Sequence, residues 1–412
     1  MTLPLQNPVS PLGLHFFSRL IQTRRRFREL ANWQPVTGTL APGQPKVSVM
    51  LITYNHERFI AQALDSVLSQ KRDFDIEINV MDDASTDRTQ DIVREYAARH
   101  PDIIHCYFNS TNVGHVATQL NTIRGFSTLR GQYFALLEGD DYWTEPEKLS
   151  RQVAFLESHP DFVACAHYTR KVFDDGSRPP EHFLPFKAFG RQEANSHDLI
   201  TMAAVYHLSS VVYRNVFGLN PPLCLADPAS CEVTIHMVYG QFGKFHCFKE
   251  YWSAYRVHGQ GVFSRESQES HWLFHLKGFR RFPWYLGPRT WPSFAIAVRG
   301  FSRYILVARA RGVVSKLAPS TYVIALLHFI PAAAAALLFK TGRIVKRLFQ
   351  RNHPFKGAAM ELYDGFVGLI PDSMIHAYLT WENRYPAVQH RRRKLKSVIN
   401  PNPPTNPTKQ TP

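Results

Sequence analysis

The chain has 412 residues, which is enough for a large core and more than one structural unit. Its hydrophobic content of 44% excludes a largely disordered chain. The formal net charge of +15 indicates an anionic partner, such as a phosphate-bearing ligand, an anionic lipid surface or nucleic acid. We do not expect nucleic acid, because the sequence has no zinc-finger spacing, no RNP-like aromatic strand and no basic heptads.

Residues 1–45 are expected to form a basic helical segment and a linker. Apolar residues recur at roughly helical spacing from Leu14 to Trp33, and the arginines of 24–26 lie between them. Such a helix could lie on a membrane surface or pack against the main domain, and the pattern leaves both readings open. Prolines and glycines between Pro35 and Pro45 then break the chain.

Strands and helices alternate in the next part of the chain. This alternation predicts a mostly parallel, Rossmann-like sheet flanked by helices. The expected strands are 47–52, 77–81 and 103–108, and the expected helices are 59–68 and one capped by Ser85 or Thr86. Further along we expect a helix after Pro146, a strand over 162–168, loops over 174–200, a strand over 205–213, a helix over 235–239 and a closing segment over 251–258.

Polar residues follow the expected strands 47–52 and 77–81 and a third expected strand, which leads through Leu136 and Leu137 into Glu138. Ligands of parallel sheets bind at the carboxyl ends of the strands. We therefore expect three groups to meet at one edge of the sheet: Thr53 to Asn55, Asp82 with Asp83, and Glu138 to Asp141.

The last of these groups places three carboxylates, Glu138, Asp140 and Asp141, within four positions. Like charges this close repel one another, so a bound cation is one reason for gathering them. Carboxylate oxygens suit Mg²⁺ or Mn²⁺, and these ions in turn hold phosphates. A solvated acidic turn is the alternative reading.

Five segments, taken in their order along the chain, resemble the family 2 glycosyltransferases, which are inverting enzymes with the GT-A fold. The segments are Val47–Asn55, Ser66–Gln70, Met81–Asp87, Asn112–Gly114 and Glu138–Trp143. The resemblance covers residues 46–265 and implies an α/β GT-A domain that binds a nucleotide-sugar.

The resemblance also implies roles on the donor side. Thr53 and Tyr54 would line the base pocket, with Tyr54 stacking on the base. Asp83 would hydrogen-bond the base or the ribose, while Asp82 supports the turn. Asn112 and Gly114 would shape the loop beneath the ribose, and Glu138 stands where the family has the first aspartate of an Asp-any-Asp motif.

For the metal and the acceptor, the resemblance implies a second set of residues. Asp140 would bind Mn²⁺ or Mg²⁺ with Asp141 assisting, and Arg256 or His258 would reach the diphosphate or the metal. The catalytic base would be Glu232, which precedes a helix followed by Gly243-Lys244, with Asp227 as the second candidate. A solvated carboxylate at a helix N-terminus is the alternative for Glu232.

The region after the domain is expected to associate with a membrane. We divide it into a helical connection (266–317), an apolar segment with basic flanks (318–351), a basic helical region (352–399) and a disordered tail (400–412). The run from Tyr322 to Phe339 lacks charged side chains and is at the short limit for a membrane span. Because basic residues flank both sides, we favour surface attachment over a true span or a soluble helix.

Together these features predict a metal-dependent inverting glycosyltransferase that uses a nucleotide-diphosphate sugar. Its acceptor would be a lipid-linked or cell-surface glycan, and it would be cytoplasmic, peripheral or monotopic at the inner face of the membrane. The processive synthases of the family usually carry Gln-x-x-Arg-Trp, which is absent after Glu232, so we expect transfer of a single sugar. Because Glu138 and Glu232 replace the usual aspartates, a catalytically degenerate nucleotide-sugar-binding scaffold is the alternative.

Overall fold

The structure is a computed structural model. It describes residues 43–112, 124–177, 179–183, 191–226 and 230–259, and parts of 275–310. No helix in the described part of the chain is long and apolar enough to cross a membrane. The expectations for the N-terminal helix, for 318–351, 352–399 and 400–412, and for Gly114 and Asp227 lie outside the described residues.

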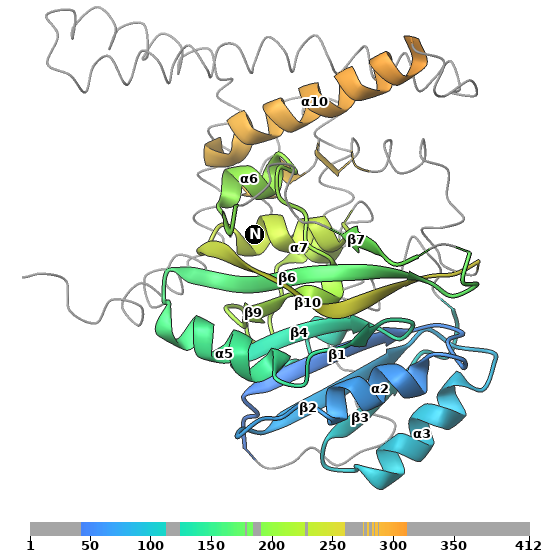
Figure 1. Cartoon of the computed structure of the whole chain (residues 1–412). Coiled ribbons are helices and arrows are strands. Elements are labelled where there is room, and N and C mark those ends of the chain that lie inside the picture. The colour runs from blue at the N-terminus through green and yellow to red at the C-terminus, as the bar shows by residue number, and fades with distance from the viewer. Residues whose placement is uncertain are drawn as a thin grey trace, which may run out of the picture.

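The first half of the domain is the expected parallel sheet (Figure 1). Strand β1 (Val47–Thr53) lies between β2 (Ile76–Asp82) and β4 (Tyr133–Glu138), and β3 (Ile104–Phe108) pairs with β2. All of these pairs are parallel. The intervening helices are α2 (Ile60–Leu68) and α3 (Thr89–Arg99). The parallel sheet predicted for this half is therefore confirmed, apart from the start of α3.

The second half of the sheet is mixed. Its strands follow the order β4-β9-β6-β10-β5. The short strand β9 is antiparallel to both β4 and β6, whereas the long strands β6 and β10 are parallel to each other. The bounds are β5 (Tyr142–Trp143), β6 (Phe162–Phe173), β7 (Glu181–Phe183), β8 (Glu193–Ala194), β9 (Val212–Arg214) and β10 (Lys244–Val257).

The expected strand over 205–213 is wrong for most of its length. The chain instead forms the 3-10 helix η2 (Leu208–Ser210) before the short β9. His207 and Ser210 close this turn, because the Ser210 amide and hydroxyl both donate to the His207 carbonyl, at 3.0 and 2.7 Å. Local side-chain bonds of this kind compete with strand pairing.

The helix after β2 starts later than expected. Its N-cap residue is Arg88, so neither Ser85 nor Thr86 caps it. Instead, the Thr86 amide donates to the Asn55 side chain at 2.8 Å, and the Asn55 amide donates to the Ser85 hydroxyl at 2.9 Å. These bonds tie the turn after β2 to the turn after β1.

Helices cover both faces of the sheet. Alternate residues of β1 enter two cores: Val49 and Leu51 pack with α2 and α3, and Met50 packs on the opposite side. A strand buried on both faces needs apolar residues throughout, which explains the continuous run in β1. The other helices are α5 (Lys148–Ser158), α6 (Ser196–Ile200), η3 (Leu223–Ala226), α7 (Glu232–Tyr239), η4 (Pro288–Thr290) and α10 (Trp291–Ala310).

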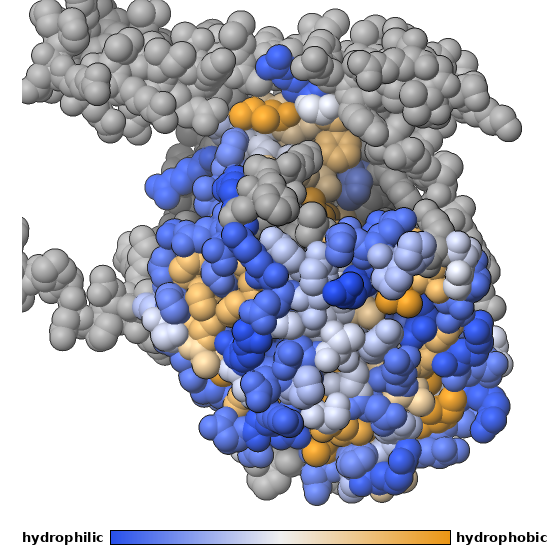
Figure 2. All heavy atoms as spheres, viewed as in Figure 1, coloured by the Kyte–Doolittle hydropathy of each residue, from blue (hydrophilic) through white to orange (hydrophobic). Residues whose placement is uncertain are grey.

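A third apolar cluster joins α10 to the domain. Phe294, Ala297 and Val298 of α10 pack with Ile200 of α6 and Met237 of α7. Figure 1 shows α10 beyond α6, on the side away from β3. The face of the domain drawn in Figure 2 is largely hydrophilic, with hydrophobic side chains in separate patches.

Candidate functional site

The ends of β1, β2 and β4 meet at one edge of the sheet, as expected. Thr53 is in register with Asp82, and Ile52 is in register with Glu138. The Asp83 amide donates to the Thr53 carbonyl at 3.0 Å, and the Gly139 amide donates to the Ile52 carbonyl at 2.8 Å. The parallel register therefore brings the three predicted polar groups together.

The two aspartates after β2 have different surroundings. The Asp82 carboxylate accepts from the Ser85 amide at 3.0 Å and from Gln90 Nε2 at 2.6 Å, so it holds the turn together. Asp83 accepts at its carboxylate from Asn109 Nδ2, at 2.7 Å, and at its carbonyl from Asn112 Nδ2, at 3.0 Å. Sequence reasoning did not single out Asn109, although it directly follows β3 as the other polar groups follow their strands.

Thr53 and Tyr54 lie at the carboxyl end of β1. Thr53 is buried, whereas Tyr54 is 39% exposed and is one of two large hydrophobic side chains in the described residues that are classed as exposed. An exposed aromatic ring offers a flat face on which a flat ligand can stack.

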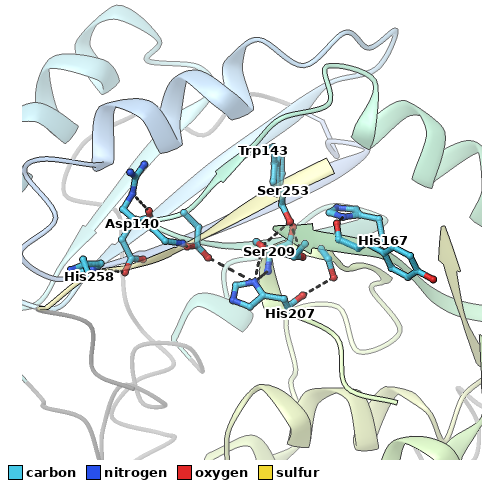
Figure 3. Close-up of polar contacts among 12 residues, drawn as sticks. Asp140, Trp143, His167, His207, Ser209, Ser253 and His258 are labelled. Carbon is cyan, nitrogen blue, oxygen red and sulfur yellow. Dashed lines mark hydrogen bonds and ion pairs between the residues drawn. The ribbon is translucent and has the colours of Figure 1, made fainter. Parts of the chain in front are cut away.

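Asp140 is flanked by two histidines. Its Oδ2 lies 3.0 Å from His258 Nε2 (Figure 3) and 3.7 Å from His56 Nε2. Burial opposes ionisation of the carboxyl, but His56 and His258 outweigh it and hold the pKa of Asp140 below its usual value. Sequence reasoning missed His56, whose Nδ1 lies 3.3 Å from Thr53 Oγ1.

Asp141 has a different set of neighbours. Its Oδ1 accepts from the Arg256 amide at 2.9 Å, and its Oδ2 lies 3.8 Å from His207 Nδ1. Burial, followed by the charges of Asp140 and Glu138, raises the pKa of Asp141 well above its usual value. Burial lowers the pKa of His207 to about 4, so this imidazole is neutral at pH 7. His207 was also missed, because no motif marks it.

The Arg256 guanidinium contacts protein groups. Its Nε donates to the Asp140 carbonyl at 2.9 Å, its Nη2 to Gln62 Oε1 at 2.6 Å, and its Nη1 to Asp174 Oδ1 at 3.4 Å. These bonds fix the end of β10 against the acidic turn and α2. A diphosphate contact for Arg256 stays a prediction.

Glu232 is the first residue of α7 and is partly buried. Burial raises its pKa to about 7. Its charge contributes to raising the pKa of Glu138, after burial and Asp140. A carboxyl that titrates near neutral pH is suited to proton transfer.

Asp140 and His258 fit a divalent cation. Adjacent ligands on an octahedral ion with bonds of about 2.1 Å lie about 3 Å apart. The 3.0 Å between Asp140 Oδ2 and His258 Nε2 matches this spacing. The structure thus brings together two of the three predicted metal ligands. The third, Asp141, instead belongs to a group with Glu138 and His207, whose ligand atoms all lie within 4.8 Å of one another.

The sheet and its acidic edge define an α/β fold of the GT-A type. Residues 48–214 match the family described as "Glycosyl transferase family 2", so this part of the chain is similar to the glycosyltransferase domains of that family.

Two relatives and one solved structure are similar to this chain. An uncharacterized protein of Mycobacterium tuberculosis (strain H37Rv) is 34% identical over 216 residues, which is 52% of this chain and 60% of that protein. The putative glycosyltransferase EpsE of Bacillus subtilis (strain 168) is 44% identical over 115 residues, or 28% of this chain and 40% of that protein. Crystalline Staphylococcus aureus TarS 1–349 with UDP-GlcNAc shares the fold, with a TM-score of 0.50, 19% identity and coverage of 70% of this chain and 81% of that one. The match thus spans less than two thirds of the mycobacterial relative.

Proposed function

We propose that this protein is a metal-dependent inverting glycosyltransferase that moves one sugar from a nucleotide-diphosphate sugar to an acceptor hydroxyl. The observation that carries the proposal is the pair Asp140 and His258 beside the strand ends, together with Glu232, a carboxyl whose pKa is about 7 and whose charge contributes to raising the pKa of Glu138. The family 2 domain supports the same reaction class.

The donor would lie over the ends of β1 and β2. Tyr54 would stack on the base, and Asp83 would hydrogen-bond the base or the ribose beside Asn112. The nucleotide-sugar class is supported by the fold shared with TarS, whose crystals contain UDP-GlcNAc. The base and the sugar of this donor are for experiment to identify.

The metal would be held by Asp140 and His258. When bound, Mn²⁺ or Mg²⁺ would neutralise the negative charge of the leaving diphosphate. The chain orients Asp140: His56 Nε2 lies 3.7 Å from its Oδ2 while His56 Nδ1 lies 3.3 Å from Thr53 Oγ1, and Arg256 Nε donates to the Asp140 carbonyl.

Glu232 would be the general base. Its carboxylate takes the proton of the acceptor hydroxyl, and the acceptor oxygen attacks the anomeric carbon from the side opposite the diphosphate. The bond from that carbon to the diphosphate oxygen breaks with its electron pair, so the configuration inverts. A pKa of about 7 lets Glu232 accept a proton near neutral pH and still hold it afterwards.

The acceptor would be a lipid-linked or cell-surface glycan at the inner face of the membrane. The net charge of +15 and the apolar, basic-flanked sequence of 318–351 support attachment to an anionic surface. Flotation of the intact full-length protein with anionic liposomes tests this part. Protein that stays in the soluble fraction at low salt would contradict it.

A panel of nucleotide-sugars tests the donor. Ligands that bind only the folded state raise its melting temperature, so the donor should raise Tm more with Mn²⁺ than without it. Transfer is then followed with the stabilising donor and a set of lipid-linked and glycan acceptors. Donor binding without transfer to any acceptor would favour the scaffold alternative, and no stabilisation by any nucleotide-sugar would contradict both.

A further inference from the structure

We propose that Glu138, Asp141 and His207 form a second divalent-cation site, separate from the pair Asp140 and His258. The inference does not depend on transferase activity, because it concerns binding of the metal alone. Figure 3 shows His258 beside Asp140, and His207 farther along the same edge of the sheet.

The three side chains converge on one point. One ligand atom from each lies within 4.8 Å of the other two, and Asp141 Oδ2 lies 3.8 Å from His207 Nδ1. An octahedral ion with bonds of about 2.1 Å keeps its ligand atoms about 3 to 4.2 Å apart. Only small side-chain rotations are therefore needed to bring all three atoms onto one ion.

A second observation points to a cation. Asp141 is 1% exposed, and its Oδ2 is buried without a hydrogen-bond partner in the described structure. No lysine or arginine of the described residues forms an ion pair with Asp141 or Glu138. Buried carboxylates are costly unless they are paired or coordinate a metal. A divalent cation would balance both charges and satisfy Oδ2.

The surroundings of His207 resemble the outer shell of a metal ligand. Its Nδ1 lies 2.8 Å from Ser209 Oγ, and Ser209 Oγ in turn lies 3.2 Å from Ser253 Oγ, to which it can donate. The Ser209 backbone amide also donates to His207 Nδ1, at 3.4 Å, so Ser209 contacts this nitrogen through both its amide and its hydroxyl. Tyr255 packs at 4.5 Å between ring centroids and fixes the ring plane.

The three proposed ligands favour one kind of divalent ion. Two carboxylates and one imidazole suit Mn²⁺ better than Mg²⁺, because imidazole favours transition metals. The coordination positions that these three residues do not fill would be open to water or to an oxygen of a bound ligand.

Mn²⁺ binding to the full-length, metal-free protein tests the proposal, measured by electron paramagnetic resonance of free Mn²⁺ without any donor. Within the domain we expect two Mn²⁺ sites. Asp140→Asn should lose one site and His207→Asn the other, with Kd raised at least about 10-fold for the lost site. His246→Asn, a histidine of β10 outside both groups, is the matched control and should keep both.

The failures are distinguishable. If His207→Asn does not fold, Glu138→Gln provides the same test, because Glu138 is the less buried ligand of the group. A single Mn²⁺ per wild-type domain that is kept in His207→Asn, or two in the His207→Asn or Glu138→Gln protein, would overturn the second site. A wild-type domain that binds one Mn²⁺, lost in His207→Asn but kept in Asp140→Asn, would instead count against the metal in the proposed transfer reaction.

Discussion

The Asp140 carboxylate lies 3.0 Å from His258 Nε2, although the two residues are 118 positions apart in the chain. Asp140 follows β4, and His258 follows β10. The contact closes the site across the sheet, because β9 and β6 separate these two strands.

Replacing Asp140 by Asn should remove the metal-dependent step. The amide keeps the shape but loses the charge that binds the cation, so we expect kcat/KM with Mn²⁺ to fall at least about 100-fold. Transfer assays over a series of Mn²⁺ concentrations measure the effect. Asp91→Asn on the exposed side of α3 is the control, because its side chain pairs with Arg94 away from the site. Wild-type turnover by Asp140→Asn would refute the metal role.

Activity should depend on the ionisation of Glu232. Only the carboxylate can take a proton, so kcat/KM should rise with pH through about 7 and level off above it. Glu232→Gln should lose about 100- to 10,000-fold in rate and also lose this limb of the profile. Donor binding, measured by calorimetry, should stay unchanged in this variant. A profile with the same limb in Glu232→Gln would assign the base to another residue.

Gly139 should not tolerate a side chain. A Cβ at this position would lie 2.7 Å from Thr53 Oγ1 and 2.9 Å from His56 Nδ1, which is closer than such contacts allow. Gly139→Ala should therefore move the acidic turn and weaken Mn²⁺ binding about 10-fold, with a small change in Tm. Gly300→Ala in α10 is the control, since no atom lies within 4 Å of its added Cβ. Equal Mn²⁺ affinity in both variants would show that the turn adapts.

Lys148 should make stability depend on pH. It is fully buried 4.1 Å from the Trp143 ring centroid, and burial lowers its pKa to about 7. Between pH 7 and 10 the unfolded chain binds this proton and the folded chain does not. The free energy of unfolding should therefore rise with pH, by at most about 1.4 kcal/mol per unit.

Urea denaturation at several pH values measures this dependence. In Lys148→Met the rise between pH 7 and 10 should be smaller, and the variant should be more stable than the wild type at pH 6. Lys249→Met removes an exposed lysine of β10 and should leave the profile unchanged. Identical pH profiles for Lys148→Met and the wild type would mean that the buried amine keeps its proton.

Much of the parallel half of the fold could be predicted from the sequence. Continuous apolar runs and helical periodicity are local signals, and they gave β1, β2, β3 and the helices between them. The late start of β9 could not be predicted. The turn at His207 and Ser210 depends on a side-chain bond that competes with strand pairing. The start of α3 was missed for the same kind of reason, since Ser85 bonds to Asn55 of another turn.

The sequence by itself determined that polar groups follow β1, β2 and β4, because parallel strands place their carboxyl ends on one edge. Only the tertiary structure decided which side chains join them. His56, His207 and His258 carry no local signal of their partners, and the 194 positions between Arg256 and Gln62 hide that bond from any sequence pattern. Contacts between distant segments form only when the strands assemble into the sheet. Only the folded chain therefore decides that Asp140 contacts His258 whereas Asp141 lies near His207.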